Sequence, residues 1–337
     1  MIKSRITGIG HYVPERVVTN DDLAQLMTTN DEWITERTGI KERRHVEPNK
    51  GITSTDLGVV AAKNALADAD LTPKDIDFII FATLSPDYYF PGNGVLLQRE
   101  LGCDTIGAMD IRNQCSGFVY ALATANAFIQ AGQYKNILVV GAEVHSFGLD
   151  YSDDGRNVSV IFGDGAGAVI LSASDDPNRG ILNTNLHSEG EFAEELAVLF
   201  PGTKFGWSDV LLEKDHSLTK KEIYPYMNGN YVFKHAVTRF PESIEEALKA
   251  ADKTPEDLDL FIPHQANLRI AQFIQKQLNL PDEKIFNNIQ KYGNTTAASI
   301  PIALSEAKQA GKIKEGDLVL LTAFGSGFTW GSVLMNW

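Results

Sequence analysis

The sequence predicts an α/β protein built as a layered α/β/α/β/α sandwich from two duplicated halves. Three observations lead to this prediction: short continuous apolar stretches typical of buried strands, Ala-rich helical stretches between them, and a helix–strand pattern that returns about 180 residues later. The 337 residues are enough to bury a large core. We expect an N-terminal half over residues 1–173 and a C-terminal half over residues 174–337.

Two patterns occur once in each predicted half. A Thr-Pro helix start followed by an apolar strand covers residues 71–80 and again residues 253–262, an offset of 182. A helix that ends at Ala-Gly before a buried strand occurs at Gly132 and at Gly311, an offset of 179. Two matched pairs at nearly one offset favour duplication over chance similarity between helix–strand units.

Composition excludes several classes of protein. The chain is 43% hydrophobic and 22% charged, as in ordinary globular enzymes, and no apolar run approaches the about 18 residues of a membrane span. The first residues lack the apolar core of a signal peptide, and two cysteines form no disulfide framework, so we expect a cytoplasmic protein. A net charge of −14 argues against bulk binding of nucleic acid.

Cys115 stands at a predicted strand-to-helix junction. It lies between the apolar strand 107–111 and a helix rich in small residues that begins at Ser116. Unpaired N–H groups and the helix dipole at this position favour the thiolate, which is the nucleophilic form of cysteine. We therefore interpret Cys115 as a candidate nucleophile, with a buried inert cysteine as the alternative. Cys103 lies in a loop and is interpreted as structural.

A histidine and an asparagine stand at comparable points of the C-terminal half. His264 ends the second strand that follows a Thr-Pro start, where α/β folds place active sites. Asn294 lies in a Gly-Asn-Thr turn, and the repeat offset carries Cys115 to about position 295. We expect Cys115 and Asn294 to occupy equivalent helix starts that face each other. A hydrogen-bonded structural histidine and a turn asparagine are the alternatives.

Two glycine-rich segments have different predicted roles. Residues 162–168 lack the Lys-Ser/Thr of a phosphate-binding loop, so their glycines predict close packing. Residues 323–331 predict a tight turn that directs backbone N–H groups at a developing oxyanion, with an ordinary hairpin turn as the alternative.

Five motifs, in order along nearly the whole chain, resemble the β-ketoacyl-acyl-carrier-protein synthase III family. They are Asp31-Glu32-Trp33-Ile34 with Arg37-Thr38-Gly39-Ile40, Phe162 to Ala168, Pro263 to Arg269, Gly293-Asn294-Thr295, and Gly327-Phe328-Thr329-Trp330-Gly331. Members of this family have a thiolase-like fold and catalyse the decarboxylating condensation that starts type II fatty-acid synthesis. The resemblance therefore implies an acyltransferase with a catalytic triad of Cys115, His264 and Asn294, no metal and no cofactor beyond its coenzyme A thioester substrate.

The resemblance also implies how the triad acts. Cys115 takes an acyl group from an acyl-CoA, and His264 and Asn294 hydrogen-bond the thioester of malonyl-acyl carrier protein while carbon dioxide is lost. The backbone N–H groups of Cys115 and Ser326 form the oxyanion hole on the acyl side. Two alternatives stay open. One is a specialised relative that uses medium-chain acyl-CoA or transfers the acyl group in a secondary-metabolite pathway. The other is a non-catalytic dimer partner or scaffold.

The remaining implied residues contact substrate or partner proteins. The residues expected to bind coenzyme A are Trp33, Arg37, Arg156, Gly229, Asn230, Phe233 and Asn267. Phe90 is expected to reach into the acyl pocket of a second subunit, which implies a homodimer. The residues expected to dock the acidic carrier protein are Lys234, Arg239, Arg269 and Lys276, with a solvated helix face as the alternative.

The chain departs from the family pattern at three places. Asn113-Gln114 stands where a small pair usually precedes the nucleophile, with Ser116 after it, and Ser326 replaces a glycine of the last loop. The stretch 191–226 is longer than expected and contains Phe200-Pro201-Gly202 and Phe205-Gly206-Trp207. We expect this stretch to help set acyl-chain length and the preferred primer to be longer than acetyl.

Overall fold

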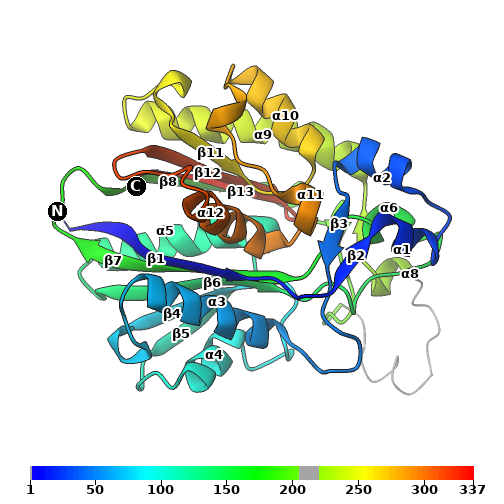
Figure 1. Ribbon diagram of the computed structural model, residues 1–337, viewed down its shortest axis with the longest axis horizontal. Helices are drawn as coiled ribbons and strands as arrows, with labels where there is room; N and C mark the ends of the chain where they lie inside the picture. Colours follow the sequence, from blue (N-terminus) through cyan, green and yellow to red (C-terminus); the bar gives the residue numbers. More distant parts are fainter. Residues whose placement is uncertain (1, 205–219) are drawn as a thin grey trace.

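The computed structural model describes residues 2–204 and 220–337. The long stretch 191–226 is called the insertion below, and its residues Phe205 and Trp207 lie outside the described residues. The described chain forms five layers in the order helix, sheet, helix, sheet, helix (Figure 1). This arrangement confirms the predicted layered sandwich.

The first sheet has five strands in the order β1-β7-β6-β4-β5. Their bounds are β1 Lys3–Tyr12, β4 Phe78–Ala82, β5 Gly107–Ile111, β6 Asn136–Glu143 and β7 Gly165–Ser174. β4 is parallel to both β5 and β6, whereas β7 is antiparallel to β6 and β1. Helices cover both faces of this sheet, which explains why its parallel strands are continuously apolar.

The second sheet has four strands in the order β11-β12-β13-β8. Their bounds are β8 Gly180–Ser188, β11 Leu260–Pro263, β12 Leu318–Gly325 and β13 Thr329–Asn336. β11 runs parallel to β12, and β12, β13 and β8 are antiparallel neighbours. β11 is therefore an edge strand, and its C-terminal end lies next to Thr322 of β12.

Three helix pairs complete the layers. Their bounds are α3 Ser54–Asp68 and α4 Asn93–Leu101 on the first sheet, α5 Gly117–Gln130 and α12 Ser299–Gln309 in the centre, and α9 Gly229–Ala250 and α10 Leu268–Gln277 on the second sheet. The central pair shares one hydrophobic core with both sheets, including Phe118, Ile262 and Ile300. Because this core crosses the middle of the molecule, the two halves are packed as one body. We propose that they divide at residues 173 and 174, one residue inside the end of β7.

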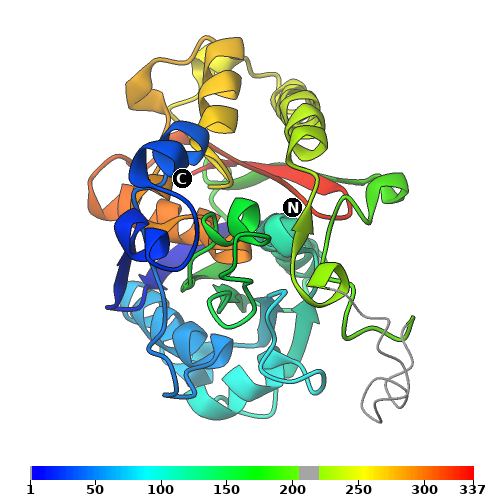
Figure 2. The same cartoon turned by 90° about the vertical axis from the view of Figure 1, so that its right-hand side faces the viewer.

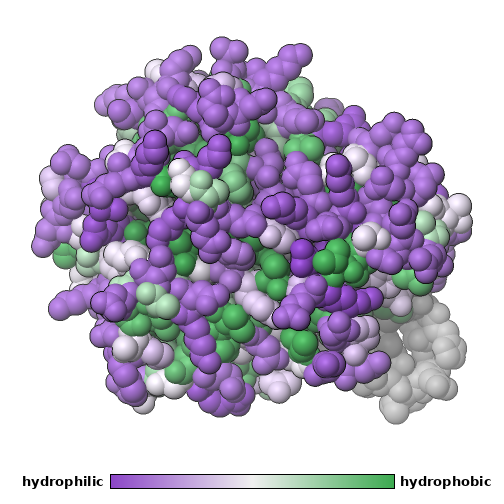
Figure 3. Space-filling view, viewed as in Figure 1, coloured by the Kyte–Doolittle hydropathy of each residue, from purple (hydrophilic) through white to green (hydrophobic). Residues whose placement is uncertain are grey.

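Shorter elements lie at one end of the layers, on the right of Figure 1 and toward the viewer in Figure 2. They include β2 Val17–Thr19, α1 Asn20–Ala24, α2 Asp31–Thr38, β3 Glu42–Arg44 and α6 Arg156–Ser159. The others are β9 Leu196–Ala197, α8 Lys220–Ile223, β10 Tyr226–Met227 and α11 Ile289–Tyr292. The surface seen in Figure 3 is mostly hydrophilic with separate hydrophobic patches.

The repeat is visible at the level of single hydrogen bonds. Thr72 with Asp75 and Thr254 with Asp257 form the same capping box at the start of a short 3₁₀ helix, 182 residues apart. Each box precedes the first parallel strand of its half, β4 or β11. The repeated sequence pattern therefore builds the same supersecondary unit twice.

The residue-level equivalence between Cys115 and Asn294 was wrong. Two non-glycine residues with positive φ mark the true correspondence: Gln114 (φ 42°) and Thr296 (φ 51°), again 182 residues apart. Cys115 thus corresponds to Ala297, and Asn294 lies three residues earlier in the chain. The offset of 179 read at the glycines reflects the shorter central helix of the second half: α12 has 11 residues and α5 has 14.

Candidate active site

Cys115 lies in η2, a 3₁₀ turn over Gln114–Ser116 that joins β5 to α5. Its side chain is 7% exposed. Gly325, the last residue of β12, lies directly against it: a Cβ at Gly325 would be 2.5 Å from the Cys115 Cβ and 2.9 Å from its sulfur. Glycine at position 325 is therefore required for the close approach of β12 to the thiol.

The thiol of Cys115 is in a different electrostatic state from the one predicted. Burial, helped by the Glu143 carboxyl, raises the pKa of Cys115 to about 12, although hydrogen bonds from the backbone N–H groups of Cys115 and Ser326 lower it. The thiol is therefore protonated at neutral pH, because desolvation raises its pKa by more than the two N–H groups lower it. Both N–H groups therefore lie next to the sulfur, where an acyl group carried by Cys115 would place its carbonyl oxygen.

His264 follows β11 and is 3% exposed. Its backbone N–H donates to the carbonyl of Thr322 in β12 at 2.8 Å. Its Nδ1 lies 2.6 Å from the Ser299 hydroxyl, whose oxygen also accepts the N–H of Gln265 at 3.4 Å. When Ser299 donates its hydrogen to Nδ1, the imidazole hydrogen is on Nε2.

The Nε2 atom of His264 has a special position. It is buried and has no hydrogen-bond partner within the described part of the chain. Burial lowers the pKa of His264 to about 3, so the ring is neutral in the physiological range. An unpartnered buried N–H is costly unless a ligand atom accepts from it, so Nε2 is a donor ready for a substrate oxygen.

Asn294 is held by the glycine-rich segment 162–168. Its N–H donates to the Ile161 carbonyl at 2.9 Å, and its carbonyl accepts the N–H of Gly163 at 3.1 Å. A Cβ at Gly163 would be 2.2 Å from the Tyr292 carbonyl oxygen, so the predicted close packing is correct. The Asn294 Oδ1 accepts the Thr296 N–H at 2.8 Å, which leaves the amide hydrogens as the outward donors of this side chain.

The three predicted catalytic residues come from segments that pack around the end of β12. The turn η2, with Cys115, contacts both β12 and η6, the 3₁₀ turn Thr296–Ala298. His264 is tied to β12, and Asn294 to the first residue of η6, by the hydrogen bonds just described. The fold therefore gathers one buried thiol and two neutral hydrogen-bonding side chains at one end of the central helix pair.

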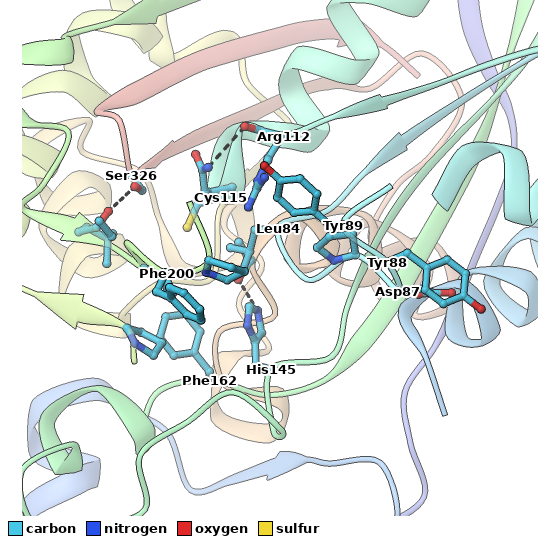
Figure 4. Close-up of a pocket in the computed structure, with 18 residues that line it drawn as sticks. Leu84, Asp87, Tyr88, Tyr89, Arg112, Cys115, His145, Phe162, Phe200 and Ser326 are labelled. Carbon is cyan, nitrogen blue, oxygen red and sulfur yellow. Dashed lines mark hydrogen bonds between the residues drawn. The ribbon is translucent and has the colours of Figure 1, made fainter. Parts of the chain in front are cut away.

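A cavity of about 570 Å³ opens beside the Cys115 sulfur. In Figure 4 the sulfur points toward Leu84 and Phe200, and Ser326 lies beside it. Tyr88 and Tyr89 lie farther along the cavity, and neither His264 nor Asn294 is among the lining residues. The cavity therefore provides a space next to the Cys115 thiol, and the two donors lie outside its lining.

Much of the cavity wall comes from the predicted insertion. The lining residues from this stretch are Leu196, Ala197, Val198, Phe200, Pro201 and Pro225. β9 and β10 hold the wall as a small antiparallel ladder, with Leu196 opposite Met227. These six residues therefore pack at the site, whereas Phe192 of the same stretch packs against Tyr231 and Phe328.

Three of the residues expected to bind coenzyme A, Trp33, Arg37 and Arg156, lie together at α2 and α6. Arg37 and Arg156 place their guanidinium carbons 4.5 Å and 4.9 Å from the ring centroid of Trp33. Asn267 donates to the Arg37 carbonyl at 2.9 Å and caps α10. Because Arg37 lies on the indole ring, a base can stack between them only after the guanidinium moves outward.

The other expected coenzyme A contacts and the expected carrier-protein contacts lie on α9 and α10. Gly229 and Asn230 are exposed at the start of α9, and the Arg269 guanidinium lies 6.0 Å from the Phe233 ring centroid. Arg239 is already ion-paired, because Glu189 and Glu242 bind it at 2.9 Å and 2.8 Å. The basic side chains that remain exposed are Lys234, Arg269 and Lys276.

Phe90 lies in an exposed aromatic segment. Tyr88, Tyr89 and Phe90 are 57%, 56% and 80% exposed, although the two tyrosines also line the cavity. Contiguous exposed aromatics of this kind mark binding surfaces. The Phe90 side chain itself does not line the cavity of its own chain.

Sequence reasoning missed several residues that support the site. Ser299, the first residue of α12, orients His264. His145 lines the cavity, its Nε2 lies 2.6 Å from the Thr296 hydroxyl, and burial lowers its pKa to about 4. The hydroxyl oxygens of Ser116 and Thr329 are 2.7 Å apart, and this contact connects η2 to the start of β13. These contacts join residues that are far apart in sequence, so the sequence alone does not show them. The one signal was Ser116, which departs from the family pattern.

The described part of the chain has neither a metal-binding cluster nor a membrane-spanning helix. Between residues 2–204 and 220–337, no group of three or more His, Cys, Asp or Glu side chains is placed to hold a metal ion. Over the same residues, no helix combines the length and the apolar character that crossing a membrane requires.

Comparison with known proteins gives one consistent family. The profile described as 3-Oxoacyl-[acyl-carrier-protein (ACP)] synthase III matches residues 109–190, and the profile of its C terminal part matches residues 248–337. The chain is 46% identical over 334 residues to the Beta-ketoacyl-[acyl-carrier-protein] synthase III of Aquifex aeolicus, covering 99% of both.

Solved structures of related enzymes share the fold over almost the whole chain. The β-ketoacyl-[acyl carrier protein] synthase III of Thermus thermophilus superimposes with a TM-score of 0.90 at 40% identity, covering 99% of both chains. The priming β-ketosynthase of the R1128 polyketide biosynthetic pathway superimposes with a TM-score of 0.88 at 32% identity, covering 99% of this chain and 96% of its own.

Proposed function

The chain belongs to the 3-oxoacyl-[acyl-carrier-protein] synthase III family, and we propose that its site condenses an acyl-CoA primer with malonyl-acyl carrier protein through Cys115, His264 and Asn294. The product is a 3-oxoacyl-acyl carrier protein, so the enzyme is an acyltransferase that initiates fatty-acid synthesis. Its substrates are thioesters, and none of the proposed steps uses a further cofactor.

The first half-reaction transfers the acyl group to Cys115. A bond forms between the sulfur of Cys115 and the acyl carbon, and the bond from that carbon to the coenzyme A sulfur breaks. The proton of the Cys115 thiol leaves with coenzyme A as its thiol. During the transfer the N–H groups of Cys115 and Ser326, which lie next to the sulfur, stabilise the tetrahedral oxyanion.

The second half-reaction forms the new carbon–carbon bond. The carboxylate of the malonyl group leaves as carbon dioxide, and the remaining enolate oxygen accepts hydrogen bonds from His264 Nε2 and Asn294 Nδ2. The enolate carbon attacks the acyl carbon on Cys115, and the released thiolate takes up a proton. Neutral donors suit this step, because the low pKa of His264 keeps the imidazole uncharged.

The observation that carries this function is the pairing of a buried thiol, approached by two backbone N–H groups, with the unpartnered Nε2 of His264. The test is to incubate the protein with hexanoyl-CoA and malonyl-acyl carrier protein. We expect equimolar carbon dioxide, coenzyme A and 3-oxooctanoyl-acyl carrier protein, and much less product when malonyl-CoA replaces the carrier-protein thioester. No condensation with any acyl-CoA from acetyl to octanoyl would contradict the proposal.

Primer length is the finer part of the proposal. The cavity of about 570 Å³ is far larger than a two-carbon acetyl group needs, and the insertion supplies much of its apolar wall. We propose a primer longer than acetyl, in primary fatty-acid synthesis. The likeness to the priming β-ketosynthase keeps one alternative in view, a priming role in a polyketide pathway.

Phe200→Ala tests the wall. We expect the kcat/KM of self-acylation to fall about tenfold for octanoyl-CoA relative to acetyl-CoA, because losing the ring removes burial equal to about two methylenes at ~0.8 kcal/mol each. Phe273→Ala is the matched control, since this aromatic lies on α10 and does not line the cavity. An acetyl preference in the parent that Phe200→Ala leaves unchanged would show that the wall does not select the primer.

Three features outside the reaction centre complete the proposal. The exposed Tyr88–Phe90 segment supports a homodimer in which Phe90 reaches the partner subunit's acyl pocket. Lys234, Arg269 and Lys276 support docking of the acidic carrier protein, whereas the charge of Arg239 is compensated by its two glutamates. A cytoplasmic location fits a site that depends on a free thiol.

A further inference from the structure

Ser326 connects two parts of the site that have different tasks. It lies beside the Cys115 sulfur at the edge of the cavity (Figure 4), directly after Gly325, which packs against the same thiol, and its backbone N–H belongs to the proposed oxyanion hole. Its side-chain hydroxyl donates to the carbonyl of Leu196 in β9, which belongs to the cavity wall. Figure 4 draws this hydrogen bond at the edge of the cavity. One residue therefore contacts both the reacting sulfur and the wall that faces the acyl chain.

The hydroxyl is needed for this connection. The family pattern has glycine at position 326, and glycine has no side chain that reaches the wall. The other side of Ser326 is also fixed, because the Thr329 hydroxyl donates to the Ser326 carbonyl at 3.0 Å. The backbone of Ser326 is thus held between β13 and the wall strand β9.

The wall strand has a second anchor, at the residue before Leu196. Asn228 donates from its backbone N–H to the Glu195 carbonyl at 2.8 Å and from its side chain to the Glu195 carboxylate at 2.9 Å. Leu196 is therefore held by two separate contacts: Asn228 binds the preceding residue, Glu195, and the hydroxyl of Ser326 binds the Leu196 carbonyl. An acyl chain that presses on Leu196 displaces β9. Because the Ser326 hydroxyl is hydrogen-bonded to Leu196, that displacement also moves Ser326 of the proposed oxyanion hole.

We propose that Ser326 is a positioning residue that couples the filling of the primer cavity to the alignment of the oxyanion-hole N–H. A primer long enough to pack against Leu196 then raises the rate constant of Cys115 acylation, rather than only tightening binding. Remote binding energy is used in this way when it improves geometry at the reacting atoms. The proposal rests on the acyl-transfer function proposed above.

The test measures Cys115 acylation in single turnovers with acetyl-CoA and hexanoyl-CoA. Each experiment gives the rate constant at saturation and the half-saturating concentration, for the parent, Ser326→Ala and Ser326→Thr. In the parent we expect a higher saturating rate constant with hexanoyl-CoA. In Ser326→Ala we expect the hexanoyl-to-acetyl ratio of rate constants to fall about tenfold, the size of one lost hydrogen bond. Ser326→Thr, which keeps a hydroxyl, should restore part of the ratio.

Asn228→Ala provides an independent variant, because it loosens the same wall without touching the oxyanion-hole loop. It should lower the same ratio, and it keeps the test available if Ser326→Ala does not fold. An equal fall for both primers, a change confined to half-saturation, or a parent without the ratio would each overturn the coupling. A parent that no acyl-CoA acylates would instead remove the proposed function itself, so the two failures are distinguishable.

Discussion

Asn294→Asp and His264→Ala are expected to slow decarboxylation of malonyl-acyl carrier protein by about 10²–10³-fold, the usual cost of losing a positioned donor. Asn294→Asp is the sharper change, because its carboxylate still accepts the Thr296 N–H but no longer donates to the enolate oxygen. Both variants should keep most of their self-acylation, since the N–H groups at Cys115 belong to Cys115 and Ser326.

The measurement is release of labelled carbon dioxide, run beside acylation by labelled acyl-CoA. Because the pKa of His264 is about 3, the imidazole stays neutral and decarboxylation should show no titration of this residue between pH 5 and pH 9. His187→Ala is the matched control, a histidine at the surface that pairs with Glu246. Loss of acylation with decarboxylation intact would reverse the assigned roles.

Cys115→Ala is expected to have the opposite effect. Without the sulfur no acyl-enzyme forms, so self-acylation and condensation should fall more than about 10³-fold. Decarboxylation should continue, because His264 and Asn294 are held by Ser299, Thr296 and the backbone rather than by the thiol. The same two assays measure this variant, with Cys103→Ala as the control. If Cys115→Ala stops decarboxylation as well, the two half-reactions do not use separate groups.

The sequence predicted the layers because their signals are local. A Thr-Pro start with an Asp three residues after the Thr is a capping box wherever it occurs, and continuous apolar runs such as 78–82 form strands covered on both faces. The residue-level match between halves failed for a physical reason. α12 is shorter than α5, so one offset could not describe both ends of the repeat.

Burial decided the electrostatics of the predicted site residues, and sequence position does not reveal burial. The helix start at Cys115 is real, yet desolvation of a side chain that is 7% exposed outweighs it and leaves a protonated thiol. Sequence position also gave no hint that Arg239 is compensated by Glu189, fifty residues away. Contacts between distant segments, such as His264 with Ser299 and Ser326 with Leu196, appear only once the chain is folded.

The most direct test of the central assignment is to locate the acyl group after incubation with acyl-CoA alone. Intact mass and peptide mapping would be applied to the parent and to Cys115→Ala. We expect one acyl group per chain, carried by Cys115, with Cys103 unmodified and with no stable label on Cys115→Ala. An acyl group on Cys103, or a parent that carries no label with any acyl-CoA from acetyl to octanoyl, would contradict Cys115 as the acyl-carrying nucleophile.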